Sequence, residues 1–263
     1  MERLPIYQDA IEVSHLAVRF ELPEEPVTPF AILYLHGFGS RQTGEKADFF
    51  RGRALLDGIP FASFDFQGHG DSGGSLGELT VTRNLGDVAR VAGWLAARGW
   101  ERLALFGSSM GGATGLWHAA LYPETVIAAA HVAPALGMRR GFERWAGAEG
   151  LARWQREGAI RFRGELVEAD LGWTLMEDLE RYPIEDLVAQ YRTPTLIFQG
   201  QRDASVDWRD VEDFARRAQP GVVDLRLLPE GDHRLIDNKA DLWEEARAFL
   251  VAAATAYLPP EAR

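Results

Sequence analysis

Short runs of apolar, β-branched and aromatic residues recur along the chain, separated by longer segments whose apolar residues recur every three or four positions. Such runs are typical of strands buried on both faces, and the longer segments are typical of helices that cover a sheet. The alternation predicts an α/β fold with a mostly parallel central sheet and helices on both faces. The predicted strands are residues 12–22, 30–35, 61–66, 102–106, 126–132, 194–198 and 223–228, and the first of these counts as two strands if a turn breaks it. The predicted helices are residues 81–98, 110–121, 208–218 and 239–257.

The stretch between Val132 and Thr193 interrupts this alternation. Connections in compact domains run about 2–6 residues, so a stretch of this length must have structure of its own. Residues 141–157 and 177–190 have helical patterns, and residues 160–167 alternate like a hairpin. We therefore expect a cap, or lid, of residues 134–190 inserted after the sixth strand of a core formed by residues 1–133 and 191–263.

Charges are unevenly distributed within this predicted cap. Residues 139–163 contain seven arginines and three glutamates, whereas residues 165–186 contain eight acids and one arginine. The favoured interpretation is that two solvated faces pair with each other. The alternative is that the arginines attract an anionic substrate.

Composition excludes several classes of function. The 263 residues carry a formal net charge of −11, which argues against a nucleic-acid partner. The absence of cysteine excludes disulfides, thiolate metal sites and a cysteine nucleophile. Residues 1–10 lack the apolar run of a signal peptide, and no segment reaches the roughly 20 apolar residues that span a bilayer. We expect a cytoplasmic protein that acts on a small-molecule substrate and does not associate with membranes. A homodimer is compatible with the sequence.

The strongest local signal is Gly107-Ser-Ser109-Met-Gly111, which follows an apolar strand and opens a helix. This Gly-x-Ser-x-Gly pattern in this context predicts a nucleophile elbow with Ser109 as the nucleophile. The two glycines leave room where a Cβ would clash, and the helix start places unpaired N–H groups beside the hydroxyl. The bland alternative is a glycine-rich turn with a serine as helix N-cap. Ser108 is the weaker candidate because it occupies an unconstrained position.

A serine nucleophile needs a base, and the base needs an orienting acid. Among six histidines, His233 lies in a loop directly after the last predicted strand. His15, His118 and His131 fall within predicted strands or a helix and are better explained as packing or satisfied core groups. Asp203 follows the strand before it and is the candidate acid; Asp207, a candidate N-cap, is the second choice. The order Ser109, Asp203, His233 is that of α/β-hydrolases.

These motifs make the sequence resemble serine hydrolases of the α/β-hydrolase fold, and more narrowly the cinnamoyl or feruloyl esterase-like carboxylesterases. The likeness covers nearly all of the core from Phe30 onward. The segment from His36 to Ser40 resembles that family's oxyanion loop, the segment 64–74 resembles the loop after its next strand, and the segment from Tyr182 to Asp186 resembles the end of its cap. The residues of the elbow from Gly107 to Met110, and those of the predicted cap, differ from the family's pattern.

The resemblance implies that the backbone N–H groups of Phe38 and Met110 form the oxyanion hole. It implies neither a metal nor an organic cofactor. His36 and His69 are then loop-shaping residues that bond neighbouring backbone, and Asp65, Asp71 and Ser72 belong to the same structural class.

The sequence thus predicts a serine carboxylesterase that hydrolyses esters of small to medium acyl groups, aromatic cinnamoyl-type acids included, through an acyl-enzyme. A thioesterase or a serine aminopeptidase of the same fold would use the same chemistry. A non-catalytic ligand-binding protein on a hydrolase scaffold is the alternative from another class.

Overall fold

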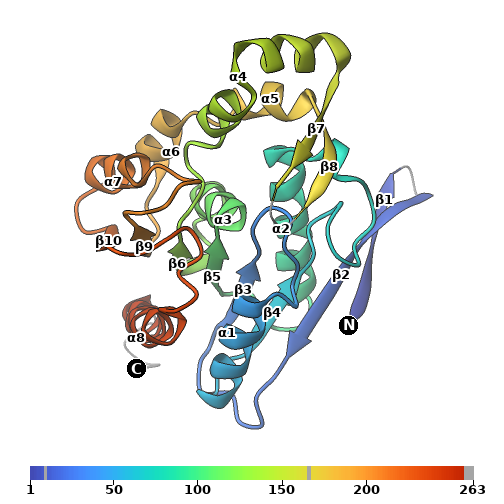
Figure 1. Ribbon diagram of the computed structural model, residues 1–263. Helices are drawn as coiled ribbons and strands as arrows, with labels where there is room; N and C mark the ends of the chain where they lie inside the picture. The colour runs from blue at the N-terminus through green and yellow to red at the C-terminus, as the bar shows by residue number, and fades with distance from the viewer. Residues whose placement is uncertain (9–10, 165–166, 258–263) are drawn as a thin grey trace.

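A computed structural model describes residues 1–8, 11–164 and 167–257. Its centre is an eight-stranded sheet in the order β1-β2-β4-β3-β5-β6-β9-β10 (Figure 1). The strands β1 and β2 and the strands β2 and β4 pair antiparallel, and every other neighbouring pair is parallel. This confirms the predicted α/β fold. The strands are β1 (Glu2–Gln8), β2 (Ile11–Glu21), β3 (Ala31–Leu35), β4 (Phe61–Phe64), β5 (Leu103–Ser108), β6 (Val126–Val132), β9 (Thr195–Gly200) and β10 (Val223–Leu228).

Helices cover both faces of the sheet, and each face has its own apolar core. One core joins the sheet to α2 (Val81–Ala96), α3 (Met110–Leu121) and α7 (Trp208–Arg217). The other joins it to α1 (Glu45–Leu56) and α8 (Lys239–Tyr257), where the rings of Phe50 and Phe106 stack 4.4 Å apart. Strands β3 to β6 are buried along their whole length, as their predominantly apolar sequences predict.

Two elements of the core were not predicted. Strand β1 contains Pro5, which weakens a strand pattern but is tolerated at a sheet edge, where β1 lies. Helix α1 has a narrow apolar stripe of Ala47, Phe50 and Ala54 among charged residues and Gly52, so its periodicity is faint. No turn breaks β2 into two strands. Six strands still precede the inserted segment, because β1 is the additional one.

The segment between β6 and β9, termed the β6–β9 segment, stands above the carboxyl ends of the strands (Figure 1). It contains α4 (Met138–Glu157), β7 (Ala159–Arg163), β8 (Glu168–Gly172), α5 (Thr174–Leu179) and α6 (Ile184–Gln190). The single helix expected over residues 177–190 is wrong: Pro183 separates α5 from α6, because the residue before a proline is driven out of helical geometry. Part of the predicted 160–167 hairpin lies outside the described residues, but β7 and β8 do pair antiparallel.

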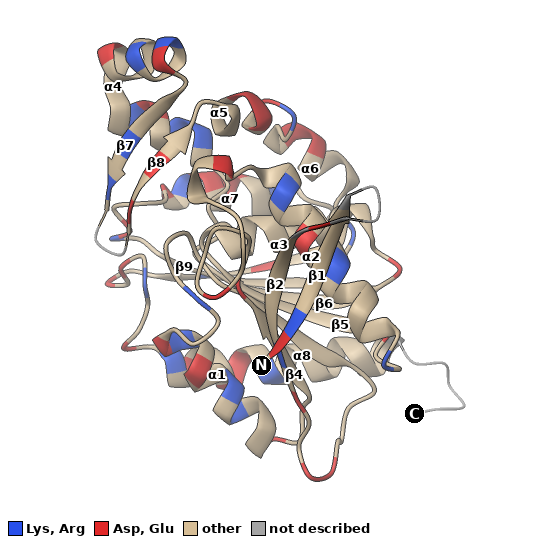
Figure 2. Ribbon diagram, turned by 90° about the vertical axis from the view of Figure 1, so that its right-hand side faces the viewer, with Lys and Arg blue, Asp and Glu red and all other residues tan. Residues whose placement is uncertain are grey.

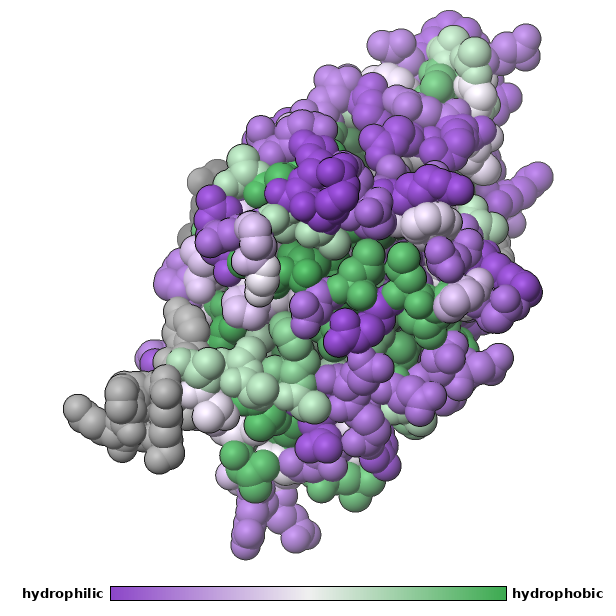
Figure 3. All heavy atoms as spheres, turned by 90° about the vertical axis from the view of Figure 1, so that its left-hand side faces the viewer, coloured by the Kyte–Doolittle hydropathy of each residue, from purple (hydrophilic) through white to green (hydrophobic). Residues whose placement is uncertain are grey.

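An aromatic cluster forms the interior of the β6–β9 segment. Trp154 is fully buried and donates a hydrogen bond of 2.8 Å to the carbonyl of Leu171 on β8. Its ring lies 5.7 Å from that of Trp173 and 5.9 Å from that of Phe142. Trp145 is the exception at 42% exposed. On the face shown in Figure 3, hydrophilic side chains predominate over the upper part of the molecule, where this segment lies.

Among the contacts that join the β6–β9 segment to the core, two involve η1 and the start of α2. Gly172 of β8 crosses the short helix η1 (Leu76–Glu78) so closely that a Cβ on Gly172 would lie 2.4 Å from the carbonyl oxygen of Gly77. Asp178 of α5 accepts hydrogen bonds from the backbone N–H (2.9 Å) and the hydroxyl (2.6 Å) of Thr82, in the first turn of α2. That N–H has no acceptor within its own helix, so Asp178 completes the N-terminus of α2.

Among the described residues, five of the seven arginines of the 139–163 stretch form ion pairs, and three of these, Arg139, Arg161 and Arg163, pair with acids of the 165–186 stretch, which is the pairing that the favoured interpretation expects. Figure 2 shows basic residues on β7 and acidic residues on the neighbouring β8. Arg161 and Arg163 of β7 bond Glu168 of β8 at 3.1 and 3.0 Å. Arg139 bonds Glu143 and Glu180, each at 2.9 Å. Within the part of the chain that the structure describes, no helix is both long and apolar enough to span a membrane.

Candidate active site

Ser109 stands on a sharp turn between β5 and α3. Its backbone angles, φ 53° and ψ −119°, are unusual for a residue with a Cβ and mark local strain. The neighbouring glycines are needed for space. A Cβ on Gly107 would lie 2.7 Å from the carbonyl oxygen of Gly111, and one on Gly111 would lie 2.2 Å from that of Leu35. The predicted elbow geometry is confirmed, and the N-cap alternative is not, because the Ser109 side chain makes no capping hydrogen bond.

The structure brings Ser109, His233 and Asp203 together from three separate loops. His233 Nε2 lies 3.0 Å from Ser109 Oγ, and His233 Nδ1 lies 2.7 Å from Asp203 Oδ2. Both distances are within hydrogen-bonding range. The Asp203 side chain is inaccessible to solvent, whereas the His233 side chain is 25% exposed. The imidazole therefore links a buried carboxylate to a hydroxyl, which is the arrangement of a serine nucleophile, its base and an orienting acid.

Asp203 is held in its ionised form. Burial alone would raise the pKa of this carboxyl, but the hydrogen bond and charge of His233 and the backbone N–H groups of Val206 and Ser205, each 2.8 Å from Oδ1, hold its pKa below the ordinary value. Gln199, at 0% exposed, donates a further hydrogen bond of 3.0 Å to Oδ2. Sequence reasoning missed Gln199; its only signal was a polar residue near the end of an apolar strand.

Asp207, the second candidate acid, and Asp232, which directly precedes His233 in the sequence, are bonded elsewhere. Asp207 caps the N-terminus of α7 by accepting a hydrogen bond from the N–H of Arg209, as expected of the second choice. Asp232 turns toward the backbone of its own loop and accepts from the N–H groups of Arg234 and Leu235. Neither carboxylate is bonded to His233 in the described hydrogen bonds.

Four histidines are buried as neutral groups. Burial lowers the pKa of His36 and of His118 to about 4, and that of His69 and of His131 to about 3. The Nδ1 atom of His131 accepts a hydrogen bond from the N–H of Gly107. His118 packs against Tyr122 with no hydrogen-bond partner among the described residues, so it is a packing group and not a satisfied one.

His36 shapes the loop after β3. Its Nε2 accepts a hydrogen bond of 3.1 Å from the N–H of Phe66, so the proton lies on Nδ1, which donates to the carbonyl of Gly37 at 2.8 Å. His69 likewise lies 3.4 Å from the carbonyl of Gln67. The loop-shaping interpretation of both residues is confirmed.

Asp65 and Ser72 tie the neighbouring loops together. Asp65 accepts from the N–H groups of Gln42 and Asp71, at 2.6 and 2.9 Å. Ser72 donates to the carbonyl of Asp65 and accepts from the N–H of Ala17. These bonds are structural, as expected.

Phe38 and Met110 flank the nucleophile. Met110 is the first residue of α3, so its N–H has no acceptor within the helix. The loop that carries Phe38 comes so close to the elbow that a Cβ on Gly37 would lie 3.3 Å from Ser109 Cβ. The Phe38 ring packs 5.3 Å from Phe162 of β7, so the loop also contacts the β6–β9 segment.

Ser109 and His233 open into a cavity of about 770 Å³ between the core and the β6–β9 segment. That volume is within the range of small-molecule sites. Its walls include Phe38, Phe142, Trp145 and Phe162, together with the side chain of Lys46. Sequence reasoning missed Lys46, which stands in the unpredicted helix α1. No cluster of three or more described His, Asp and Glu residues could hold a metal ion.

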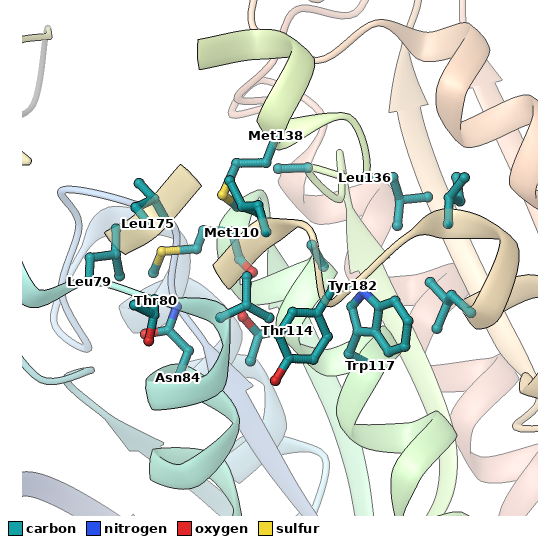
Figure 4. Close-up of a pocket in the computed structure, with 16 residues that line it drawn as sticks. Leu79, Thr80, Asn84, Met110, Thr114, Trp117, Leu136, Met138, Leu175 and Tyr182 are labelled. Atoms are coloured by element: carbon teal, nitrogen blue, oxygen red, sulfur yellow. The ribbon is translucent and has the colours of Figure 1, made fainter. Parts of the chain in front are cut away.

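A second, smaller pocket of about 30 Å³ lies behind Met110 (Figure 4). It shares Leu79, Met110, Ala135 and Met138 with the large cavity. Its other walls are mainly apolar and include Leu175 and Trp117. The space is about that of one or two water molecules, so it admits the end of a small apolar group but no long chain without movement of the side chains.

Comparisons with known proteins agree with this fold. The chain is 27% identical over 227 residues to the mouse mitochondrial palmitoyl-protein thioesterase ABHD10, an alignment covering 80% of this chain and 71% of that protein. A putative hydrolase from Agrobacterium vitis S4 superposes with a TM-score of 0.83 at 24% identity over 95% of this chain and 98% of that one. The Est1E protein of Butyrivibrio proteoclasticus, solved with ferulic acid, superposes with a TM-score of 0.76 at 19% identity over 93% and 99%.

The family described as serine aminopeptidase, S33, matches residues 30–164, the stretch that includes the loop carrying Phe38 and the elbow. With the sheet order and the elbow described above, this match identifies a hydrolase of the α/β-hydrolase fold. The chain belongs to the serine aminopeptidase S33 family of α/β-hydrolases.

Proposed function

We propose that this protein is a serine carboxylesterase that hydrolyses esters of small to medium acyl groups. The observation that carries the proposal is the continuous hydrogen-bonded chain from Ser109 Oγ through His233 to the buried carboxylate of Asp203. In the proposed mechanism Ser109 attacks the ester carbonyl while His233 Nε2 takes its proton. His233 then returns the proton to the leaving alcohol, and a water molecule repeats the cycle on the acyl-enzyme.

Asp203 remains ionised throughout and stabilises the imidazolium, which agrees with the lowered pKa of its carboxyl. The N–H groups of Phe38 and Met110 are assigned to the oxyanion of the tetrahedral intermediate. Donors of this kind are worth about 2.7–4 kcal/mol of transition-state stabilisation. Residues 134–190 are assigned as a cap whose aromatic side chains, including Trp145 and Phe142, form the roof of the cavity.

The small pocket behind Met110 supports the acyl-size limit. It lies beside a proposed oxyanion donor and is apolar, so it suits the end of the acyl group. Its volume of about 30 Å³ favours short chains, while wider groups such as aromatic acids fit the 770 Å³ cavity.

Thioester hydrolysis is the second candidate, favoured by the 27% identity to the mouse thioesterase. Aminopeptidase activity has less support, because a free peptide N-terminus needs an available carboxylate. The described acids that line the cavity are Glu45, Asp207 and Asp232, and each is already bonded to another group. None of them comes from the β6–β9 segment.

The test is the initial rate of 4-nitrophenyl butyrate hydrolysis at neutral pH for wild type, Ser109→Ala, Asp203→Asn and Asp207→Asn, with butyryl-CoA as a parallel substrate. We expect no activity above background for Ser109→Ala and a fall of roughly 10³–10⁴-fold for Asp203→Asn, since an amide stabilises the wrong tautomer of histidine. Asp207→Asn should lose far less. Equal activity of wild type and Ser109→Ala, with no fluorophosphonate adduct on Ser109, would instead favour the ligand-binding alternative.

A further inference from the structure

Lys46 reaches the catalytic cavity from the first turn of α1. Its Nζ donates a hydrogen bond of 2.6 Å to Oγ of Ser108, the residue directly before the nucleophile. Ser108 is 5% exposed, and Lys46 and Ser108 both line the large cavity beside Ser109. The amine is therefore hydrogen-bonded to the residue that precedes the nucleophile and faces the same cavity.

The surroundings of Lys46 differ from those of the other lysine in the chain. Lysine occurs only at positions 46 and 239. Lys239 forms an ion pair of 2.7 Å with Glu45. The Lys46 ammonium donates one of its three protons to Ser108. Among the described residues, no carboxylate lies within 4.0 Å of it to form an ion pair. A partly buried cation of this kind attracts an anion into the cavity.

Lys46 remains largely protonated at neutral pH. Burial, and after it repulsion from Arg234, lower the pKa of Lys46 to about 8, while the charges of Asp232, Asp203 and Glu45 act in the opposite direction. The amine is therefore a cation when the proposed triad works.

The position of Lys46 distinguishes the two halves of an ester. The small apolar pocket lies behind Met110, on the side assigned to the acyl group. Lys46 directly follows Glu45, whose carboxylate lies 4.0 Å from the guanidinium of Arg234, the residue after His233. Because His233 must deliver its proton to the leaving oxygen, the wall that carries Lys46 faces the leaving group.

We propose that Lys46 binds a carboxylate carried by the leaving group, so that the preferred substrates are esters whose alcohol part is anionic. This inference rests on the proposed esterase function and deepens it. Ser108 orients the ammonium through the 2.6 Å hydrogen bond, and the charge of the incoming carboxylate supplies the missing ion-pair partner.

The test uses matched phenyl esters with the same butanoyl group: 3-(butanoyloxy)benzoate and its neutral methyl ester, and the same pair with the substituent at the 4-position. The measured quantity is the ratio of kcat/KM for the anionic ester to that for its neutral partner. Comparing this ratio between variants cancels the intrinsic reactivity of each leaving group. We expect at least a fivefold lower ratio in Lys46→Met for one of the two positions and a largely retained ratio in Lys46→Arg.

Lys239→Met is the matched control, because it removes a lysine charge near α1 that does not line the cavity. Its ratio should stay within twofold of wild type. An unchanged ratio in Lys46→Met at both positions would overturn the inference while leaving the esterase proposal intact. Loss of all hydrolysis in wild type would instead refute the esterase proposal.

A binding measurement distinguishes failure of the Lys46 inference from failure of the esterase proposal. Reductive methylation with ¹³C-formaldehyde labels two lysines and the N-terminal amine, and Lys46→Met assigns the Lys46 signal. Titration with 3- and 4-hydroxybenzoate should shift that signal saturably, and the methyl esters of the same phenols should not. A Lys46 signal that does not respond to either carboxylate contradicts the inference even in protein without measurable turnover.

Discussion

Gln199 Nε2 donates a 3.0 Å hydrogen bond to Oδ2 of Asp203, the same oxygen that lies 2.7 Å from His233 Nδ1. Gln199 is fully buried on β9, so it fixes the rotamer of a carboxylate that stands on the following loop. The amide acts through Asp203 and is a positioning residue.

Replacing Gln199 with leucine removes this donor while keeping an apolar side chain of similar size. A hydrogen bond to a charged group is worth about 1.5–3 kcal/mol, and we expect roughly half of that to appear as a tenfold lower kcat with little change in KM. Gln201→Leu, two residues further along and just after the end of β9, is the control. Steady-state kinetics on 4-nitrophenyl butyrate would contradict the role if both variants lost activity equally.

The small pocket behind Met110 should set the acyl-chain length. Leu175→Ala enlarges it and should raise the preference for 4-nitrophenyl octanoate over butyrate several-fold, whereas Ala113→Val fills it and should lower that preference. Because Leu175 is 1% exposed, its truncation also costs about 2–5 kcal/mol of stability, so rates should be measured well below the melting temperature. The same direction of change in both variants would disprove the assignment.

Buried neutral histidines should make the protein sensitive to acid. Burial lowers the pKa of His118 to about 4, whereas an unfolded histidine has a pKa near 6.5. Between these values the unfolded chain binds the extra proton, so the free energy of unfolding falls as pH falls through this window.

His118→Leu removes one such group without breaking a described hydrogen bond. Between pH 6 and pH 4.5 the variant should lose about 1 kcal/mol less per pH unit than wild type, measured by urea denaturation. Identical slopes for the two proteins would show that His118 is charged in the folded state. Substitution of His15, a half-buried histidine on strand β2, is the comparison.

Two glycines with open space for a Cβ should respond in opposite directions to alanine. Gly93 lies inside α2, and alanine there should stabilise the fold by about 0.5–1 kcal/mol. Gly99 has φ +88°, a conformation that alanine adopts only with strain, so Gly99→Ala should destabilise it. Thermal unfolding of both variants checks the signs; stabilisation by both would mean that backbone angle does not matter at position 99.

The sequence was sufficient for the elements that repeat a strong pattern. Strands such as β5 and β6 are predominantly apolar, and Ser109 lies in a motif whose flanking glycines are sterically required, so both were predictable. The positions of Asp203 and His233 followed from the rule that loops after parallel strands meet at one edge.

The residues that were missed depend on contacts between distant segments. Gln199 and Lys46 carry no local signature, because each matters only for what tertiary structure places beside it: Asp203 in one case and Ser108 in the other. Helix α1 escaped detection because only three of its residues, Ala47, Phe50 and Ala54, are buried. The break between α5 and α6 could have been read from Pro183, and was not.

The hydrogen bonds between Asp178 and Thr82 restrict how the protein can be re-engineered. A chimera that took the 134–190 stretch from a relative would lose the carboxylate that serves the N-terminus of α2, at roughly 0.5–2 kcal/mol. This stretch therefore cannot be exchanged independently of the core. The donor sequence must supply an acid that hydrogen-bonds Thr82, or the N-terminus of α2 in the recipient must be redesigned at the same time.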